Sequence, residues 1–290
     1  MSQKILVVGG TGMLGKPVAE KLSTSGFDVT VLTTNVDKAK ENFANSINIT
    51  YGDVTKPETL KEPIEGKDFV YINLNAKMTP ELYETLEIGG CESIAKISKE
   101  LGVKRIGYIS GASSHGVKKD IIYLDAKVEA ENRIINSGVP YMIFRASWFY
   151  ESLPKFIQQG KALVLGDQPN AYSWLSASDF AQQVTNAFKN ERAENKCFYN
   201  GGPEKLTMTE ALARFCAVCH PDLSPEKLSF GMAKMLSNLP GMSALKLAIP
   251  FFEYFSTNVE HIDMSEADTI LGKNNTTVDQ WARLYKNKAS

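Results

Sequence analysis

The sequence predicts an α/β fold built on a doubly wound parallel sheet. Short apolar runs rich in β-branched residues alternate with helical patterns along much of the chain, which is typical of parallel strands joined by helices. The first apolar run, residues 5–8, leads through a glycine-rich turn into a helical pattern at residues 16–22. A chain of 290 residues, 43% of them hydrophobic, suits one large α/β domain or one such domain plus a small lobe.

The turn after the first strand resembles a phosphate-binding loop in its glycine spacing. Gly9, Gly12 and Gly15 follow at intervals of three, one residue longer than the Gly-x-Gly-x-x-Gly pattern. Glycine lets the backbone approach a pyrophosphate, and the start of the next helix offers free N–H groups and a partial positive charge. We therefore expect a dinucleotide to bind at this loop. The expected contacts of the loop are Gly9, Thr11, Gly12, Met13, Leu14 and Gly15.

Composition excludes several classes of partner. The formal charge is −1, from 32 basic and 33 acidic residues, so no global field attracts nucleic acid or an anionic membrane. The N-terminal residues enter a strand without a signal-peptide pattern, and no apolar run approaches the length of a membrane span. Four cysteines in this context predict free thiols in a reducing compartment. We expect a cytoplasmic monomer or homodimer that acts on a small apolar substrate.

One cysteine motif matches the pattern of c-type haem attachment. Cys216 and Cys219 are separated by two residues and followed by His220. Thr207 and Glu210 precede them with the spacing of a helix capping box, so we interpret the cysteines as core thiols of an amphipathic helix. Three histidines are scattered along the chain, and no metal site is expected: His115, His220 and His261.

The end of the second strand bears on the choice between NAD and NADP. NAD enzymes usually place Asp or Glu here to bind the ribose 2′-hydroxyl, whereas NADP enzymes accommodate a 2′-phosphate with a basic residue. Residues 29–32 are followed by Thr33, Thr34 and Asn35, with Lys38 close behind. None of these side chains carries a negative charge, so the sequence favours NADP(H) over NAD(H).

The third and fourth strands supply further candidate contacts for a cofactor. Asp53 follows the strand at residues 47–51, where it would contact the adenine edge or shape the turn. Leu74 and Asn75 stand at the end of the strand that begins at residue 69, and ligands of doubly wound sheets lie beyond the carboxyl ends of the strands.

A long helix is expected from residue 80 to residue 101. Gly89 and Gly90 interrupt it, which costs helix stability. A close approach of backbone or ligand would explain the two glycines, and so would packing of the helix on the sheet.

A tyrosine and a lysine form the candidate catalytic pair. Tyr123 and Lys127 are four residues apart on a predicted helix, so both project from one face. An ammonium beside a phenol lowers the pKa of the phenol, and the lysine can also bond ribose hydroxyls. Chance alone yields such a pair in a chain with 11 tyrosines, so its position after the fifth strand matters most. Ser110 or Ser113 would orient the substrate oxygen.

Motifs spread over residues 4–285 resemble the NmrA-like group of atypical short-chain dehydrogenases/reductases. The shared motifs are Gly9-Gly-Thr-Gly12-Met-Leu-Gly15, Gly52-Asp53, Gly102-Val-Lys-Arg105, Ser110-Gly111, Lys127-Val-Glu-Ala-Glu131, Ser137-Gly-Val-Pro140, Phe144-Arg145, Phe149-Tyr-Glu151, Ser176-Ala-Ser-Asp179-Phe-Ala181 and Thr277-Val-Asp-Gln-Trp281. The resemblance implies a Rossmann domain, a smaller C-terminal α/β lobe, and NAD(P) between the two. We assign residues 1–150, with returning segments from 171–200, to the NAD(P)-binding domain and residues 151–290 mainly to a substrate-binding lobe.

Members of the group fall into two functional kinds. Some reduce quinones, dyes or other apolar carbonyl and conjugated compounds, whereas others bind NAD(P) as redox sensors or regulators and lack the catalytic tyrosine. This sequence keeps Tyr123 and Lys127, which favours an NAD(P)H-dependent oxidoreductase. It departs from the group at Thr34, where many members carry an arginine for the NADP phosphate. A nucleotide-sugar epimerase or dehydratase is a third alternative, although arginines for a diphospho-sugar are scarce.

Two apolar stretches are candidates for the substrate pocket. Trp148, Phe149 and Tyr150 follow the sixth strand, where they would border the nicotinamide or belong to the core. Residues 224–256 are rich in Met and aromatic side chains, including Phe230 and Met235, and such side chains suit a pliable apolar pocket. This stretch is either a lid over the substrate or the core of the lobe.

Overall fold

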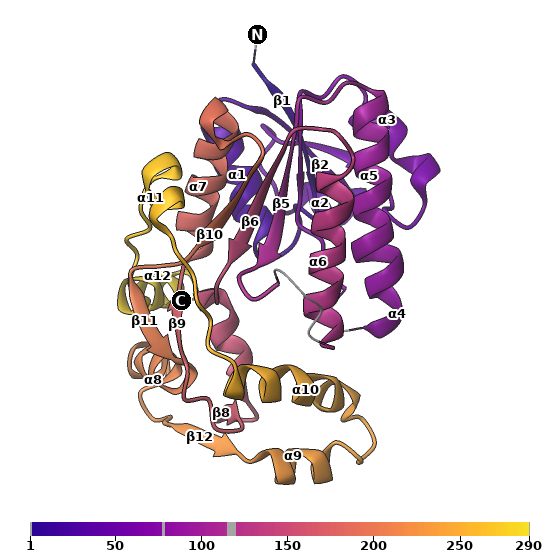
Figure 1. The fold of residues 1–290 in the computed structure, drawn as a ribbon. Helices are drawn as coiled ribbons and strands as arrows, with labels where there is room; N and C mark the ends of the chain where they lie inside the picture. Colours follow the sequence, from indigo (N-terminus) through magenta and orange to yellow (C-terminus); the bar gives the residue numbers. More distant parts are fainter. Residues whose placement is uncertain (1, 77–78, 115–119, 290) are drawn as a thin grey trace. The chain divides into compact units, whose positions relative to one another are not determined.

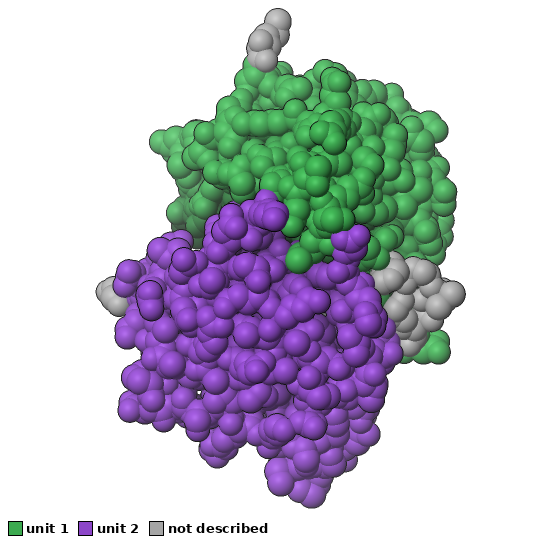
Figure 2. All heavy atoms as spheres, turned by 60° about the vertical axis from the view of Figure 1, so that its left-hand side comes forward, with its two compact units in different colours: residues 1–146, 180–200, 264–272 green, residues 147–179, 201–263, 273–290 purple. Residues whose placement is uncertain are grey.

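The chain divides into two compact units, coloured separately in Figure 2. The computed structural model describes residues 2–76, 79–114 and 120–289. Unit 1 comprises Met1–Ala146, Phe180–Asn200 and Met264–Gly272. Unit 2 comprises Ser147–Asp179, Gly201–Asp263 and Lys273–Ser290. Each unit is therefore assembled from three separate stretches of the chain.

Unit 1 is built on a parallel seven-stranded sheet in the order β10-β6-β5-β4-β1-β2-β3 (Figure 1). The strands are β1 (Lys4–Val8), β2 (Asp28–Thr33), β3 (Asn48–Tyr51), β4 (Phe69–Ile72), β5 (Arg105–Gly111), β6 (Tyr141–Ala146) and β10 (Lys196–Asn200). Ile5 of β1 pairs with Val29 of β2 on one side and with Phe69 of β4 on the other. The chain thus winds outward from β1 in both directions, which confirms the predicted doubly wound α/β fold.

Helices cover both faces of this sheet (Figure 1). They are α1 (Gly15–Thr24), α2 (Val36–Lys40), η1 (Pro57–Thr59), α3 (Lys61–Ile64), α4 (Pro80–Leu82), η2 (Tyr83–Ile88), α5 (Gly89–Glu100), α6 (Ile122–Ile135), α7 (Ala177–Lys189), η4 (Glu191–Ala193) and α11 (Ser265–Leu271). Ile64 of α3, Ile94 of α5 and Ile134 of α6 join one buried cluster on the sheet. On the other face, Phe188 of α7 packs against Tyr71, with ring centroids 6.5 Å apart.

The helix expected from residue 80 to residue 101 is divided into three pieces. A single turn, α4, passes into the π-helical segment η2, and regular α-helix resumes only at α5. Gly90 explains part of this arrangement, because a Cβ there would lie 3.2 Å from the Val54 side chain and 3.3 Å from that of Leu74. The wider π-helical turn buries Tyr83 and Glu87, four residues apart.

Unit 2 combines small sheets with helices. Its elements are η3 (Tyr150–Phe156), β7 (Ile157–Gln158), β8 (Lys161–Leu165), β9 (Ala171–Trp174), β11 (Glu204–Thr207), α8 (Met208–Cys219), β12 (Pro225–Leu228), α9 (Phe230–Leu236), α10 (Ser243–Thr257) and α12 (Val278–Ala289). Strand β9 pairs with β11 in antiparallel fashion, and β8 pairs with both β7 and β12. A cluster that includes Leu165, Ala233 and Ile249 packs α9 and α10 against β8.

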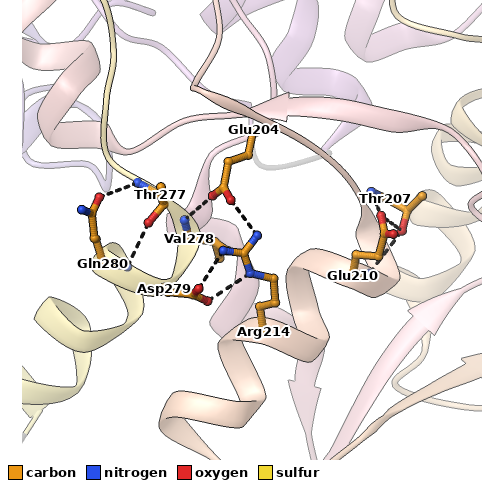
Figure 3. Close-up of polar contacts among 8 residues, drawn as sticks. All are labelled: Glu204, Thr207, Glu210, Arg214, Thr277, Val278, Asp279 and Gln280. Atoms are coloured by element: carbon orange, nitrogen blue, oxygen red, sulfur yellow. Dashed lines mark hydrogen bonds and ion pairs between the residues drawn. The ribbon is translucent and has the colours of Figure 1, made fainter.

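Polar contacts tie the start of α12 to the middle of α8 and to β11 (Figure 3). The Arg214 guanidinium donates to both carboxylate oxygens of Asp279, at 3.0 and 2.7 Å, and to Glu204 at 2.7 Å. Glu204 also accepts a hydrogen bond from the backbone N–H of Val278. Paired charge-assisted bonds of this kind fix geometry as well as adding stability.

The cysteine motif lies on α8, as expected for core thiols. The predicted capping box is confirmed: Thr207 accepts from the Glu210 backbone N–H, and the Glu210 carboxylate accepts from that of Thr207 (Figure 3). Cys216 is buried, and the half-buried Cys219 donates to the carbonyl oxygen of Ala282. Burial raises the pKa of both thiols. These cysteines therefore serve the packing of α8.

Candidate functional site

The glycine loop is held against the end of β4. Gly9 has a φ of +74°, and a Cβ on it would lie 2.0 Å from the carbonyl oxygen of Asn73. A Cβ on Gly15 would lie 2.2 Å from the carbonyl oxygen of Gly9. Both positions therefore require glycine because the loop, the first turn of α1 and the chain after β4 come into close contact.

Internal crowding does not account for the glycine at position 12 as it does for Gly9 and Gly15. A Cβ on Gly12 would lie 3.3 Å from the Gly9 carbonyl oxygen, a tight contact but a much milder one than those at Gly9 and Gly15. Gly12 is exposed, as are its neighbours Thr11 and Met13. Helix α1 begins after Leu14 with no side-chain cap and no acidic residue in its first turn. An open glycine beside an uncapped helix start is the arrangement that receives a phosphate group.

The end of β2 presents polar side chains, two of which already accept hydrogen bonds within the protein. Asn35 accepts a hydrogen bond from the backbone N–H of Lys38 and thereby caps α2. Thr33 accepts from the backbone N–H of Asn35. Thr34 and Lys38 are exposed, and within residues 2–76, 79–114 and 120–289 no carboxylate forms an ion pair with Lys38. Thr34 and Lys38 are therefore the side chains that remain accessible to a ligand.

Asp53 shapes the turn after β3. Its Oδ1 accepts hydrogen bonds from the backbone N–H and the hydroxyl of Thr55, at 3.0 and 2.7 Å. The pKa of Asp53 is lowered, first by the Thr55 hydroxyl bond and, to a smaller degree, by Lys56. The turn-forming alternative thus has direct geometric support, while contact with an adenine stays a prediction.

Lys127 lies at the carboxyl ends of the neighbouring strands β4 and β5. Its Nζ donates to the carbonyl oxygen of Leu74, just after β4, at 3.2 Å, and to that of Ile109, near the end of β5, at 3.3 Å. A third bond, of 2.7 Å, goes to Oε1 of Glu87. An ammonium has three N–H groups, so all three are used within the protein. Asn75, the other predicted contact at this strand end, is exposed.

Glu87 is a member of this site that sequence reasoning missed. Its side chain is 1% exposed and that of Lys127 is 5% exposed, so the ion pair is buried. Oε1 of Glu87 also accepts a 2.8 Å hydrogen bond from the Tyr108 hydroxyl. Burial lowers the pKa of Lys127 but Glu87 raises it, and the net direction is upward, so the ammonium stays charged.

Tyr123 lies one turn before Lys127 on α6 and is half-buried. Its ring meets the ring of Tyr83 edge to face, with centroids 6.3 Å apart. The sequence predicted a lowered pKa for this phenol, and the structure corrects that expectation. Burial raises the pKa of Tyr123, Lys127 lowers it, and the carboxylate of Glu87 raises it again, with a net upward direction. The phenol therefore stays protonated at neutral pH.

Two serine hydroxyls near the end of β5 are buried without a partner among the described residues. They belong to Ser110 and Ser114. Ser110 lies two residues after Tyr108 on β5, so both side chains point to the sheet face that Glu87 and Lys127 occupy. Ser113 is half-buried, and Ser114 was not among the predicted site residues. The hydroxyls of Tyr71, Ser98 and Tyr150 are also buried without a partner among the described residues, so it is the position of the two serines near the end of β5 that makes them candidates for ligand contact.

The predicted substrate residues all lie in unit 2. Trp148 is half-buried among Tyr172, Trp174 and Phe255, with centroid distances of 5.7, 5.7 and 5.3 Å. The ring of Tyr150 is fully buried and stacks on Trp174.

The other three substrate candidates differ in exposure. Phe149 is buried. Phe230 packs over Gly166, where a Cβ would lie 2.1 Å from its ring. Met235 is 65% exposed. Phe230 and Trp148 are both half-buried, so three of the five candidates, Trp148, Phe230 and Met235, keep accessible apolar surface. Substrate contact stays a prediction for all five.

Neither a metal cluster nor a membrane-spanning helix is found in the described residues. No group of three or more His, Cys, Asp or Glu side chains in these residues is placed to hold a metal ion. His115 lies outside the described residues. Among the helices of the described residues, none combines the length and the apolar character that crossing a membrane requires.

Comparison with known proteins places this geometry in context. Residues 9–191 match the model of a family described as NAD(P)H-binding. The chain is 24% identical to the photosystem II assembly factor Ycf39 of Trieres chinensis, over 97% of this chain and 86% of that protein. It is 24% identical to an NAD(P)H azoreductase of Xenophilus azovorans, over 82% of each chain. An NADPH-dependent quinone oxidoreductase of Escherichia coli, solved with NADPH, superposes with a TM-score of 0.75 at 20% identity, covering 97% of this chain and 99% of that one.

Gly12→Ala should separate ligand binding from folding. Because the single tight contact of a methyl group here is 3.3 Å, against 2.0 and 2.2 Å at Gly9 and Gly15, we expect the variant to fold and to lose less stability than a substitution at either of those positions. A methyl group on the open loop would displace a phosphate from a charge-assisted hydrogen bond worth about 1.5–3 kcal/mol, so the Kd for NADPH should rise about 10- to 100-fold. Calorimetric titration measures this. Gly231→Ala, at a glycine with open space around it, is the control, and an unchanged Kd for Gly12→Ala would contradict a phosphate site at the loop.

Proposed function

This chain belongs to the NAD(P)H-binding family, and we propose on that basis that it is a reductase that acts on an apolar conjugated acceptor such as a quinone, an azo compound or an unsaturated carbonyl. The observation that carries the proposal is the position of the Tyr123–Lys127 pair. Lys127 bonds the backbone at the carboxyl ends of β4 and β5, and ligands of doubly wound sheets bind beyond these ends. The relatives named as azoreductase and quinone oxidoreductase support the acceptor class.

The residues present fit a dinucleotide and divide the chemistry among them. A bound NADPH supplies the hydride. The uncapped start of α1, beside the exposed Gly12, receives the pyrophosphate. Tyr123 holds the proton that passes from its hydroxyl to the acceptor atom made basic by hydride addition, and the charge of Lys127 stabilises the phenolate left behind. Ser110, whose hydroxyl has no partner among the described residues, orients that acceptor atom.

Reduction rather than oxidation is the direction that suits Tyr123. A reductase needs a protonated phenol at the start of the step, whereas a dehydrogenase needs a phenolate. The raised pKa of Tyr123 keeps the phenol protonated. The site therefore favours proton donation at neutral pH.

Lys38→Ala tests the proposed preference for NADPH. Lys38 is exposed and has no ion-pair partner among the described residues, so its ammonium gains a charge-assisted bond only with the 2′-phosphate. The variant should therefore lose about tenfold in affinity for NADPH and little for NADH. The measurement is titration of both nucleotides. Lys40→Ala, on the same short helix, should change neither Kd. Equal losses for NADPH and NADH in Lys38→Ala would count against a phosphate contact.

Tyr123→Phe tests the proton donor. General acid catalysis contributes about 10²- to 10⁴-fold, so kcat should fall within that range while the Kd for NADPH stays unchanged. Turnover is followed as NADPH oxidation with a panel of quinones, azo dyes and unsaturated carbonyls. Tyr141→Phe, at the opposite end of the sheet, serves as the matched control. Wild-type turnover of every acceptor by Tyr123→Phe would exclude this role.

The pH dependence of reduction should reflect the raised pKa of Tyr123. The active form is the protonated phenol, so activity is present below its pKa and is lost as the pH rises through it. Because the pKa lies above the usual value of about 10, kcat should be flat from about pH 6 to about pH 9 and should decline only at higher pH. If kcat instead declines from near neutral pH, and if Tyr123→Phe removes that decline, the Tyr123 phenol loses its proton at a lower pH than the proposal requires.

A second candidate function is that of an NAD(P)H-binding assembly or regulatory protein without turnover. The observation that favours it is the similarity to Ycf39, named as a photosystem II assembly factor, over nearly the whole chain. The two functions predict opposite results when the protein with bound NADPH is exposed to the acceptor panel. A binding protein retains NADPH through repeated exposure to the acceptor panel, whereas a reductase consumes it.

A further inference from the structure

The segment that faces the Tyr123–Lys127 pair carries a matching pair of its own. Tyr83 and Glu87 are four residues apart on the π-helical segment η2, and both are buried. The ring of Tyr83 meets the ring of Tyr123, and the carboxylate of Glu87 meets the ammonium of Lys127. Two side chains one turn apart on η2 thus face two side chains one turn apart on α6.

The contacts of Glu87 explain how Lys127 is held. The 2.7 Å ion pair and the two bonds to backbone oxygens use every N–H of the ammonium. Tyr108 approaches the same carboxylate oxygen and also places its ring 4.9 Å from Lys127 Nζ. Lys127 consequently has no spare donor for a ribose hydroxyl while this network is intact. Its influence on Tyr123 is that of a fixed charge.

We propose that Glu87 is a positioning residue, which keeps Lys127 ionised in a site sheltered from water and fixes its charge one helical turn from Tyr123. This inference rests on the proposed reductase function and adds a residue that acts through Lys127 rather than on the reacting atoms. Without a nearby negative charge, a buried ammonium sheds its proton readily. A neutral Lys127 would no longer stabilise a phenolate at Tyr123.

The other ionisable groups around Glu87 leave Lys127 as its only cationic partner in the described residues. Tyr108 from β5 and Cys91 from α5 have pKa values raised well above normal by burial first and by Glu87 second, so both stay neutral. Tyr83 on η2 and Tyr123 on α6 are phenols. Glu131, one turn beyond Lys127 on α6, is paired with Arg145 at 2.6 Å.

Glu87→Gln tests the proposal through the pH dependence of stability. In the wild type the pKa of Lys127 is raised above the lysine pKa of about 10.4 in the unfolded chain. The contribution of Lys127 to the free energy of unfolding is therefore constant at pH values below that unfolded pKa. In the variant we expect that pKa to fall below the unfolded value, so that the unfolded chain binds the extra proton and stability rises with pH. The loss of stability of Glu87→Gln relative to wild type, here called the stability deficit, should then shrink between about pH 7 and about pH 9.5. The change amounts to at most about tenfold in the unfolding constant per pH unit.

Glu131→Gln is the matched control for this measurement. It removes another buried carboxylate from an ion pair that α6 forms, but the partner it leaves is Arg145, which does not lose its proton in this range. Its deficit should therefore stay constant with pH. A constant deficit for Glu87→Gln as well would overturn the proposal, because Lys127 would then remain charged without Glu87.

The rate of reduction supplies the readout that a purely structural role would not move. In Glu87→Gln the loss of the Lys127 proton should bring a new decline of kcat between about pH 7 and about pH 9, whereas Glu131→Gln should keep the wild-type profile. A shrinking stability deficit with an unchanged rate profile would reduce Glu87 to a structural role and refute the proposal. Absence of turnover in the wild type would instead count against the proposed function, and the stability measurement would still decide whether Glu87 keeps Lys127 charged.

A second variant covers the case in which Glu87→Gln does not fold at neutral pH. Adding Lys127→Met removes the unpaired charge, and replacing a buried ion pair by neutral groups is often tolerated. The double variant should fold, with a stability that does not vary over the same pH range. Failure of the double variant to recover folding would contradict the view that an uncompensated Lys127 charge causes the defect.

Discussion

The buried ion pair between Lys127 and Glu87 is the interaction on which the candidate site depends. The bonds of Lys127 join four separate elements, because Lys127 comes from α6, Glu87 from η2 and the accepting carbonyl groups from the ends of β4 and β5. Leaving one member of a buried pair alone costs about 3–5 kcal/mol, a large fraction of the stability of a domain. The pair therefore fixes where α6 meets the sheet, and with it the place of Tyr123.

The same edge of the sheet carries the glycine loop. Strand β1 lies between β2 and β4, so the loop that follows β1 emerges where the winding of the sheet reverses. Gly9 and Gly15 draw this loop against Asn73 at the end of β4, next to the residue whose carbonyl oxygen receives Lys127. At the end of β4, close backbone packing thus holds the glycine loop at Asn73, and the buried charge of Lys127 is bonded to the next residue, Leu74. Gly12, which packing alone does not require, is left open toward solvent.

Local sequence patterns predicted those elements that are determined by residues close together in the sequence. The apolar run of β1, the glycine turn and α1 could be read directly, as could the capping box of Thr207 and Glu210. Glu87 could not be found this way, because an acidic residue in a helical pattern ordinarily faces water. Its burial depends on a π-helical turn before Gly89 and on a lysine 40 residues away. The pKa of Tyr123 was misjudged for the same reason, since the expectation counted Lys127 and omitted both burial and Glu87.

A crystal structure of the protein with NADPH would test the central claim most directly. The account predicts that the pyrophosphate lies at the start of α1 beside Gly12 and that the nicotinamide end faces the hydroxyl of Tyr123, with Lys127 still bonded to Glu87. A nicotinamide bound away from Tyr123, or a Tyr123 hydroxyl turned from the cofactor and covered by protein, would contradict the reductase and leave a nucleotide-binding protein.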